Sequence, residues 1–196
     1  GVIHFIYYQA TTERSLIHLT VSAFFIGLAV LTKGPAAIII FLVSFGIYFI
    51  FRRFRIKASF RDVMIYFFVV LITGGSWYFL ILMKGDWQLI REFIQYQIRL
   101  LVTEDAGHGG FFMYHVFVLL LGVFPASFVA IPSFRDQFDG PGLRKEFFLF
   151  MMILFWVVLI LFSIVNTKIV HYSSLCYFPL TYFAALTIRK YENGET

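Results

Sequence analysis

The chain has 196 residues, of which 60% are hydrophobic and only 14% are charged, and its net charge is +5. Because soluble domains carry about 25% charged residues, this composition excludes an ordinary soluble protein and indicates an integral membrane protein. The net positive charge would suggest nucleic-acid binding in a soluble chain. In a membrane protein, however, cations belong to loops, so we expect membrane lipids and no nucleic acid as partners.

The first residues suggest a piece of a longer protein. The sequence opens with Gly1 and runs directly into the apolar stretch 2–8, without the charged segment that begins a signal peptide. We interpret this stretch as the tail of an earlier transmembrane helix, and we expect part of any active site to lie upstream.

Six further apolar stretches are each close to the roughly 20 residues that a helix needs to cross a bilayer. They cover residues 15–31, 35–51, 63–83, 111–131, 147–165 and 172–188. The predicted fold is therefore an all-α integral membrane protein, a polytopic bundle of transmembrane helices. Pro125 predicts a kink in the fourth stretch.

The connection from Lys84 to Gly110 is polar, and its first part predicts an amphipathic helix. Polar residues recur there at spacings of four, three and four, as Gln88, Glu92, Gln95 and Arg99. Apolar residues occupy the other side, which favours a helix in the extracytoplasmic membrane interface. A loop helix packed on protein would show the same pattern, so both interpretations stay open.

The loops differ in charge. With six spans, the loops 52–61 and 133–146 and the C-terminal tail share one side, and they hold ten of the cations. The positive-inside rule makes that side cytoplasmic, and we expect a multi-pass protein of the bacterial inner membrane. On this topology Lys33, His108 and Lys168 all face the extracytoplasmic side, where a shared site could form.

The segment Leu31-Thr32-Lys33-Gly34-Pro35 separates the first two predicted spans. Proline suits the first position of a helix, so a new helix should begin at Pro35. Its positive N-terminal end, the Lys33 ammonium and the accessible backbone of Gly34 would together suit a phosphate group. The alternative is a hairpin whose lysine extends to lipid headgroups.

A second threonine and lysine, Thr167 and Lys168, precede the last predicted span in the same way. Two ammonium groups could bind a diphosphate or a lipid phosphate and stabilise the charge that a phosphate gains when a glycosidic bond to it breaks. Further candidates for such a pocket are Arg99, His108 and His171. A divalent metal held by Glu104, Asp105 and His108 is an alternative with weak ligand spacing, and we assign no metal ligand and no cofactor.

These motifs resemble those of a known family. Residues 31–35 resemble the LTKGP signature of the GT-C class of polyprenyl-phosphate-dependent glycosyltransferases, in the branch of the lipid A aminoarabinose transferase and the protein mannosyltransferases. Residues 167–172, followed by Pro179, look like the family's TKLPHY and its proline. Phe93 to Arg99, Gly107-His108 and Pro125 fit the family's order of features, so that the resemblance covers most of the chain.

The resemblance implies a glycosyltransferase that moves a sugar from a polyprenyl-phosphate donor to a lipid or protein acceptor. Lys33, Gly34 and Lys168 would bind the donor phosphate, and a surrounding pocket would take in further residues. These are Thr32, Arg99, His108, Thr167, His171 and Tyr172.

Three departures from the family are visible. Val170 replaces a proline, Ala126 stands where a tryptophan often occurs, and the family's catalytic acid would lie upstream of this sequence, so the catalytic residue is unknown. Two other functions remain open. A transporter or flippase of polyprenyl-linked sugars would also need a phosphate-binding face, and in a non-enzymatic membrane scaffold the lysines would only anchor the chain.

Overall fold

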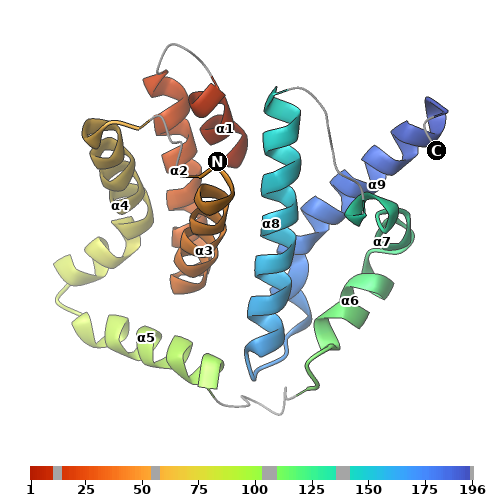
Figure 1. The fold of residues 1–196 in the computed structure, drawn as a ribbon. Helices are drawn as coiled ribbons and strands as arrows, with labels where there is room; N and C mark the ends of the chain where they lie inside the picture. The colour runs from red at the N-terminus through yellow and green to blue at the C-terminus, as the bar shows by residue number, and fades with distance from the viewer. Residues whose placement is uncertain (11–14, 54–57, 103–109, 136–141, 195–196) are drawn as a thin grey trace. The chain divides into compact units, whose positions relative to one another are not determined.

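The computed structural model describes residues 1–10, 15–53, 58–102, 110–135 and 142–194, and these ranges form helices and no strands. The helices are α1 (Val2–Ala10), α2 (Leu16–Lys33), α3 (Pro35–Phe51), α4 (Phe60–Met83), α5 (Trp87–Val102), α6 (Tyr114–Gly122), α7 (Ala126–Val129), η1 (Pro132–Phe134), α8 (Gly142–Ile164), η2 (Val170–Cys176) and α9 (Tyr177–Glu192) (Figure 1). They form two compact units. Unit 1 comprises Gly1–Tyr96 and Gly140–Phe147, unit 2 comprises Gln97–Asp139 and Phe148–Thr196, and each is described by itself.

The two long helices of unit 1, α2 and α4, approach each other closely at glycines. A Cβ atom on Gly27 would lie 1.7 Å from Oγ1 of Thr73, and one on Gly74 would lie 3.0 Å from Cβ of Val30. Glycine therefore allows the two backbones to come nearer than larger residues would, as in many helix pairs within membranes.

Two carboxylates of unit 1, the buried Asp62 and the half-buried Glu146, make polar contacts with other parts of the unit. Ser59 caps α4 in a capping box with Asp62, and the Tyr8 hydroxyl donates to the same carboxylate at 2.7 Å. In a second contact the Tyr48 hydroxyl donates to Glu146 at 2.7 Å, and Arg52 forms an ion pair with Glu146 at 3.0 Å. These partners satisfy carboxylates that would be costly to bury alone.

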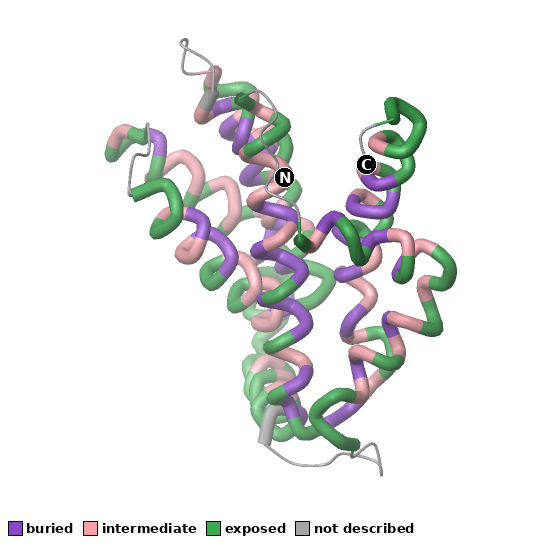
Figure 2. Tube along the Cα trace, turned by 45° about the vertical axis from the view of Figure 1, so that its right-hand side comes forward, coloured by how far each residue is buried: buried purple, intermediate pink, exposed green. Residues whose placement is uncertain are grey.

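Unit 2 has its core along α8, where buried residues recur over most of the helix (Figure 2). Aromatic rings fill the space between α8 and its neighbours. Phe155 of α8 lies 4.8 Å from Phe134 of η1, measured between ring centroids, and Phe134 lies 5.0 Å from Phe183 of α9. The Ser133 hydroxyl is also buried and hydrogen-bonds the Phe183 carbonyl at 3.0 Å, which fixes η1 against α9.

The fourth predicted span, residues 111–131, is not one kinked helix. The chain bends by 105° between α6 and the segment formed by α7 and η1. Pro125 has no backbone N–H to donate to the preceding helical turn. Its ring also clashes with the carbonyl of that turn, so a continuous helix is disfavoured here. The Ser127 hydroxyl donates to the Leu120 carbonyl at 2.7 Å and so satisfies an acceptor at the break.

Three helices, α2, α4 and α8, are long and apolar enough to cross a membrane, and the bent pair could supply a fourth crossing. This confirms a helical membrane protein. α3 is apolar but has 17 residues, and α9 has 16 residues and ends in charged side chains. The count of six spans therefore stays a prediction.

Candidate functional site

The turn between α2 and α3 consists of a single residue, Gly34. Its φ of 60° and ψ of −140° lie in a region that favours glycine, and its N–H donates to the Val30 carbonyl at 2.8 Å. α2 extends to Lys33, two residues beyond the predicted end, and α3 begins at Pro35 as predicted. The sequence therefore places the positive end of α3 directly after a lysine.

An aromatic cluster of Trp77, Tyr78 and Phe93 covers one side of this turn. A Cβ atom on Gly34 would meet the Phe93 ring at 3.0 Å and the Tyr78 hydroxyl at 3.6 Å. The Phe93 ring centroid lies 6.1 Å from those of both other rings. On this side protein atoms already lie against the glycine, so a ligand could approach the turn only from elsewhere. Sequence reasoning missed Trp77 and Tyr78, although aromatic pairs near the end of a membrane helix are a known interfacial signal.

Lys33 is exposed, and it has no ion-pair partner among the residues that the structure describes. Its neighbour Thr32 is also exposed, but the Thr32 hydroxyl donates back to the carbonyls of Leu28 at 3.0 Å and Ala29 at 3.1 Å. That hydroxyl proton is used within α2, because Ser and Thr in helices bond in this way to the preceding turn. Lys33 is therefore the cation at this turn that is available to an anion.

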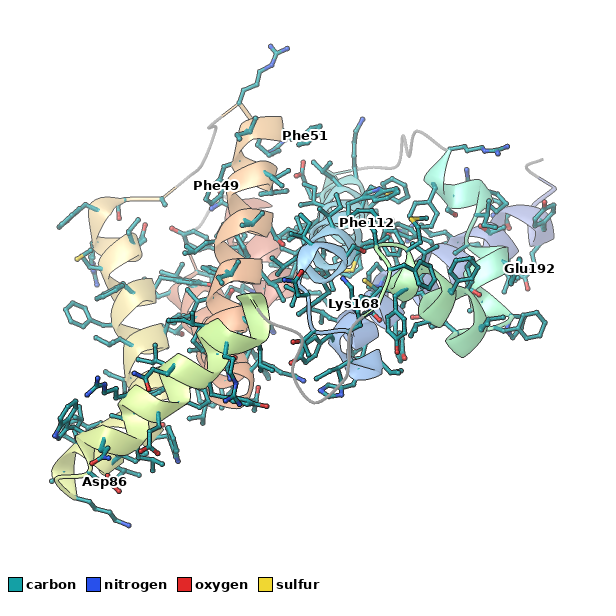
Figure 3. The ribbon with its side chains drawn as sticks, turned by 90° about the horizontal axis from the view of Figure 1, so that it is seen from below. Phe49, Phe51, Asp86, Phe112, Lys168 and Glu192 are labelled. Carbon is teal, nitrogen blue, oxygen red and sulfur yellow. The ribbon has the colours of Figure 1, made fainter. Side chains whose placement is uncertain are left out.

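Lys168 has a different environment. Its side chain is 5% exposed, and its ammonium donates to the carbonyls of Ser163 and Val165 at 2.6 Å each and of Phe162 at 3.2 Å. These carbonyls belong to the C-terminal end of α8, where acceptors lack helical partners and the helix dipole favours a cation. Figure 3 labels Lys168 close to this end of the helix.

The charge of Lys168 is affected in two opposite ways. Burial lowers the pKa of Lys168 from its ordinary value. The three carbonyl acceptors favour the ammonium form instead, since hydrogen bonds to a charged group stabilise its charge. The three protons of the ammonium form all have acceptors within the protein.

Gly110, which lies two residues after His108 in the sequence, packs against Lys168. A Cβ atom on Gly110 would lie 2.9 Å from Cγ of Lys168, so these two residues are neighbours within unit 2. His108 itself, with Glu104 and Asp105, lies outside the described residues. No group of three metal-ligating residues occurs in the described part of the chain, and the metal alternative stays untested there.

The other predicted pocket residues have mixed environments. Thr167 is fully buried, whereas His171 is exposed and its ring lies 5.2 Å from that of Tyr172 in an edge-to-face contact. Tyr172 is half-buried, with its ring 5.1 Å from Phe162. Arg99 is exposed on α5.

A buried histidine of α6, His115, lies near Lys168 in unit 2. Its side chain is fully buried, and Nδ1 lies 3.2 Å from the Ser173 hydroxyl, which donates its own proton to the Val170 carbonyl. This contact joins α6 to η2.

The two lysines thus belong to different units, Lys33 to unit 1 and Lys168 to unit 2. Their convergence on one phosphate stays a prediction from the sequence. Comparisons with protein-family models, with curated proteins and with solved structures found no match. The glycosyltransferase resemblance therefore depends on the quoted motifs alone.

Proposed function

We propose that this chain is part of a membrane glycosyltransferase that uses a polyprenyl-phosphate sugar donor. The observation that carries the proposal is the turn at Gly34, where the exposed Lys33 ammonium and the N-terminus of α3 follow each other directly. A cation and the positive end of a helix are two independent sources of attraction for a phosphate.

In the proposed reaction an acceptor nucleophile attacks the anomeric carbon of the sugar, and the bond between that carbon and the phosphate oxygen breaks. The acceptor's proton passes to a carboxylate that we expect upstream, and the phosphate leaves with an added negative charge. Lys33 stabilises that charge as it develops, which lowers the barrier. Lys168 would assist if a phosphate oxygen replaced one of its carbonyl acceptors.

The proposed location follows from the charge distribution of the loops. Most cations lie in the loops 52–61 and 133–146 and in the C-terminal tail, so these would face the cytoplasm. The Gly34 turn would then face the extracytoplasmic side of a bacterial inner membrane. A sugar donor carried by a lipid and an acceptor, either lipid or protein, would meet there.

The first test is donor binding to the chain in lipid nanodiscs, with a polyprenyl phosphate as the probe. Lys33→Ala should weaken binding by about ten- to a hundredfold, because hydrogen bonds to charged groups contribute roughly 1.5–3 kcal/mol. Lys33→Arg should retain most of the affinity. Lys84→Ala is the matched control, since Lys84 is exposed after α4 and should bind no phosphate. Equal losses at both lysines would contradict a specific site.

The second test separates the enzyme from its alternatives, using the full-length protein in vesicles with a labelled donor. A glycosyltransferase transfers the label to an acceptor, and Lys33→Ala reduces that transfer. A flippase moves the intact donor between leaflets without transferring the sugar. A scaffold would give neither result.

A further inference from the structure

The helix α5 begins where α4 ends. Gly85, with a φ of 77°, turns the chain after α4, and the Asp86 side chain accepts a hydrogen bond from the Leu89 N–H at 3.4 Å. An aspartate at this position caps the first turn of a helix, which fixes where α5 starts. Figure 1 shows α5 directed across the axes of α2, α3 and α4, and Figure 3 labels Asp86 at the turn.

The ends of three helices meet under α5 within unit 1. Gly34, which joins α2 to α3, lies against Phe93 of α5 and close to Tyr78 near the end of α4. Both α2 and α4 are long and apolar enough to cross a membrane. A helix that lies across the ends of membrane-spanning helices must run along the membrane surface.

Two groups of exposed side chains on α5 differ in polarity, and Leu89 and Tyr96, 42% and 44% exposed, lie outside both. One is polar and consists of Gln88, Glu92, Gln95 and Arg99, all exposed. The other is an apolar strip of Trp87, Ile94 and Ile98, which are 60%, 45% and 55% exposed. Spacings of seven and four residues place the strip on one side of the helix, next to the side from which Phe93 contacts Gly34.

We propose that α5 lies in the plane of the bilayer surface, with the strip formed by Trp87, Ile94 and Ile98 embedded among lipids at the boundary of headgroups and acyl chains. The polar face then remains in water. The argument for lipid is continuity, because the strip lies at the ends of helices that themselves suit a bilayer. The Arg91 guanidinium, 5.9 Å from the Trp87 ring centroid, is placed to reach lipid phosphates. This inference requires a membrane but not sugar transfer.

The experiment uses spin labels on the full chain in vesicles of phosphatidylethanolamine and phosphatidylglycerol. The sequence has one cysteine, Cys176, which is fully buried, so the unmodified chain should take up no label. Ile94→Cys and Gln95→Cys are a matched pair of neighbouring exposed positions on different faces. For each, the accessibility of the label to oxygen, which concentrates in lipid, is compared with its accessibility to a water-soluble nickel chelate.

We expect the Ile94 label to show high oxygen and low nickel accessibility at a shallow depth, and the Gln95 label to show the reverse. Three results would overturn the proposal. High nickel accessibility at both positions would place the strip in water, and low values for both reagents at Ile94 would mean that protein covers it. A depth near the bilayer centre would make α5 a membrane-spanning helix.

Discussion

At the scale of single residues, the ammonium of Lys168 serves as a cap for α8. Its three protons meet three carbonyls at the end of the helix, two of them at 2.6 Å, in a site that excludes water. A phosphate ligand would have to displace at least one of these acceptors. Lys168 therefore caps α8 before any ligand binds, and this capping role can be tested by its effect on stability.

Lys168→Met should destabilise the protein by about 1–3 kcal/mol, because the buried carbonyls of Ser163 and Val165 would lose a charged donor. Thermal unfolding in detergent micelles measures the effect. The control is Lys33→Met, which should change stability by less than about 0.5 kcal/mol since Lys33 is exposed. If both variants unfolded like the original protein, the carbonyl contacts would contribute nothing to stability.

Gly34 makes the second prediction at this scale. Gly34→Ala should cost about 1–3 kcal/mol, because a side chain is strained at its φ of 60° and the new methyl group would press on the Phe93 ring. Thermal unfolding again measures the loss.

Gly46→Ala is the matched control for the Gly34 substitution. Gly46 lies inside α3, and a Cβ atom there would have no neighbour within 4 Å. Alanine should be neutral there or stabilise by about 0.5–1 kcal/mol, since it loses less entropy than glycine in a helix. A loss at Gly46 as large as that at Gly34 would show that the turn is not specifically strained.

Pro35 and Lys168 show which features of the structure could be predicted from the sequence and which could not. Pro35 predicted the start of α3 correctly, because the preference of proline for the first helical turn is local. The environment of Lys168 could not be predicted, since it depends on how the loop after α8 folds back on the helix end. The same pattern of threonine and lysine is exposed at Lys33 and buried at Lys168.

At the scale of elements, the contact between α2 and α4 depends on glycine. A Cβ atom on Gly74 would lie 3.0 Å from Val30 and 3.1 Å from the Gly27 carbonyl, whereas one on Gly75 would meet only Leu71 Cδ1, at 3.9 Å, within 4 Å. The sequence shows that Gly74 and Gly75 are adjacent, but it does not show which of these two glycines faces α2.

Gly74→Ala should therefore destabilise unit 1 by about 1–3 kcal/mol, because an added methyl group in a close helix contact forces the backbones apart. Gly75→Ala should be neutral or slightly stabilising. Chemical or thermal unfolding of the two variants in the same detergent makes the comparison. The packing described for α2 and α4 would be wrong if Gly75→Ala were the more damaging change.

Helices predicted from long apolar runs agree with the structure, and their limits differ by a few residues. The run 147–165 corresponds to α8, and 63–83 corresponds to α4. The run 111–131 failed as a single helix because apolarity alone does not tell a straight helix from two broken segments. Pro125 located the break, but the sequence did not predict the bend of 105°.

At the scale of the whole molecule, the direction of the chain along unit 2 bears on topology. Gly110 lies beside Lys168 at the C-terminal end of α8, and the next described segment after α7 and η1 begins α8 at its other end. α8 has 23 residues and is about 34 Å long, close to the thickness of a bilayer core. Phe134, in the last part of the broken segment, lies beside Phe155 and Trp156 in the middle part of α8. A complete crossing alongside α8 therefore stays a prediction.

The predicted count of six spans can be tested by the sides of the membrane on which three exposed residues lie. Ala58 precedes α4 and Lys84 follows it, so the two must lie on opposite sides if α4 spans the membrane. Asn193 follows α9, and three crossings, by the broken segment, α8 and α9, would bring it to the side of Ala58. From the charges of the loops, the positive-inside rule predicts that the side of Ala58 is cytoplasmic.

The measurement introduces Ala58→Cys, Lys84→Cys and Asn193→Cys one at a time and treats sealed right-side-out vesicles with a membrane-impermeant maleimide. Only Lys84→Cys should react before the vesicles are opened, and all three should react afterwards. Reaction at Ala58 instead of Lys84 would reverse the orientation and place the Gly34 turn in the cytoplasm, which would remove Lys33 from an extracytoplasmic reaction. Reaction at both Lys84 and Asn193 would mean an even number of crossings between them, so that the broken segment, α8 and α9 do not all span the membrane. In that case the count of six spans would be wrong while the Gly34 turn kept its predicted side.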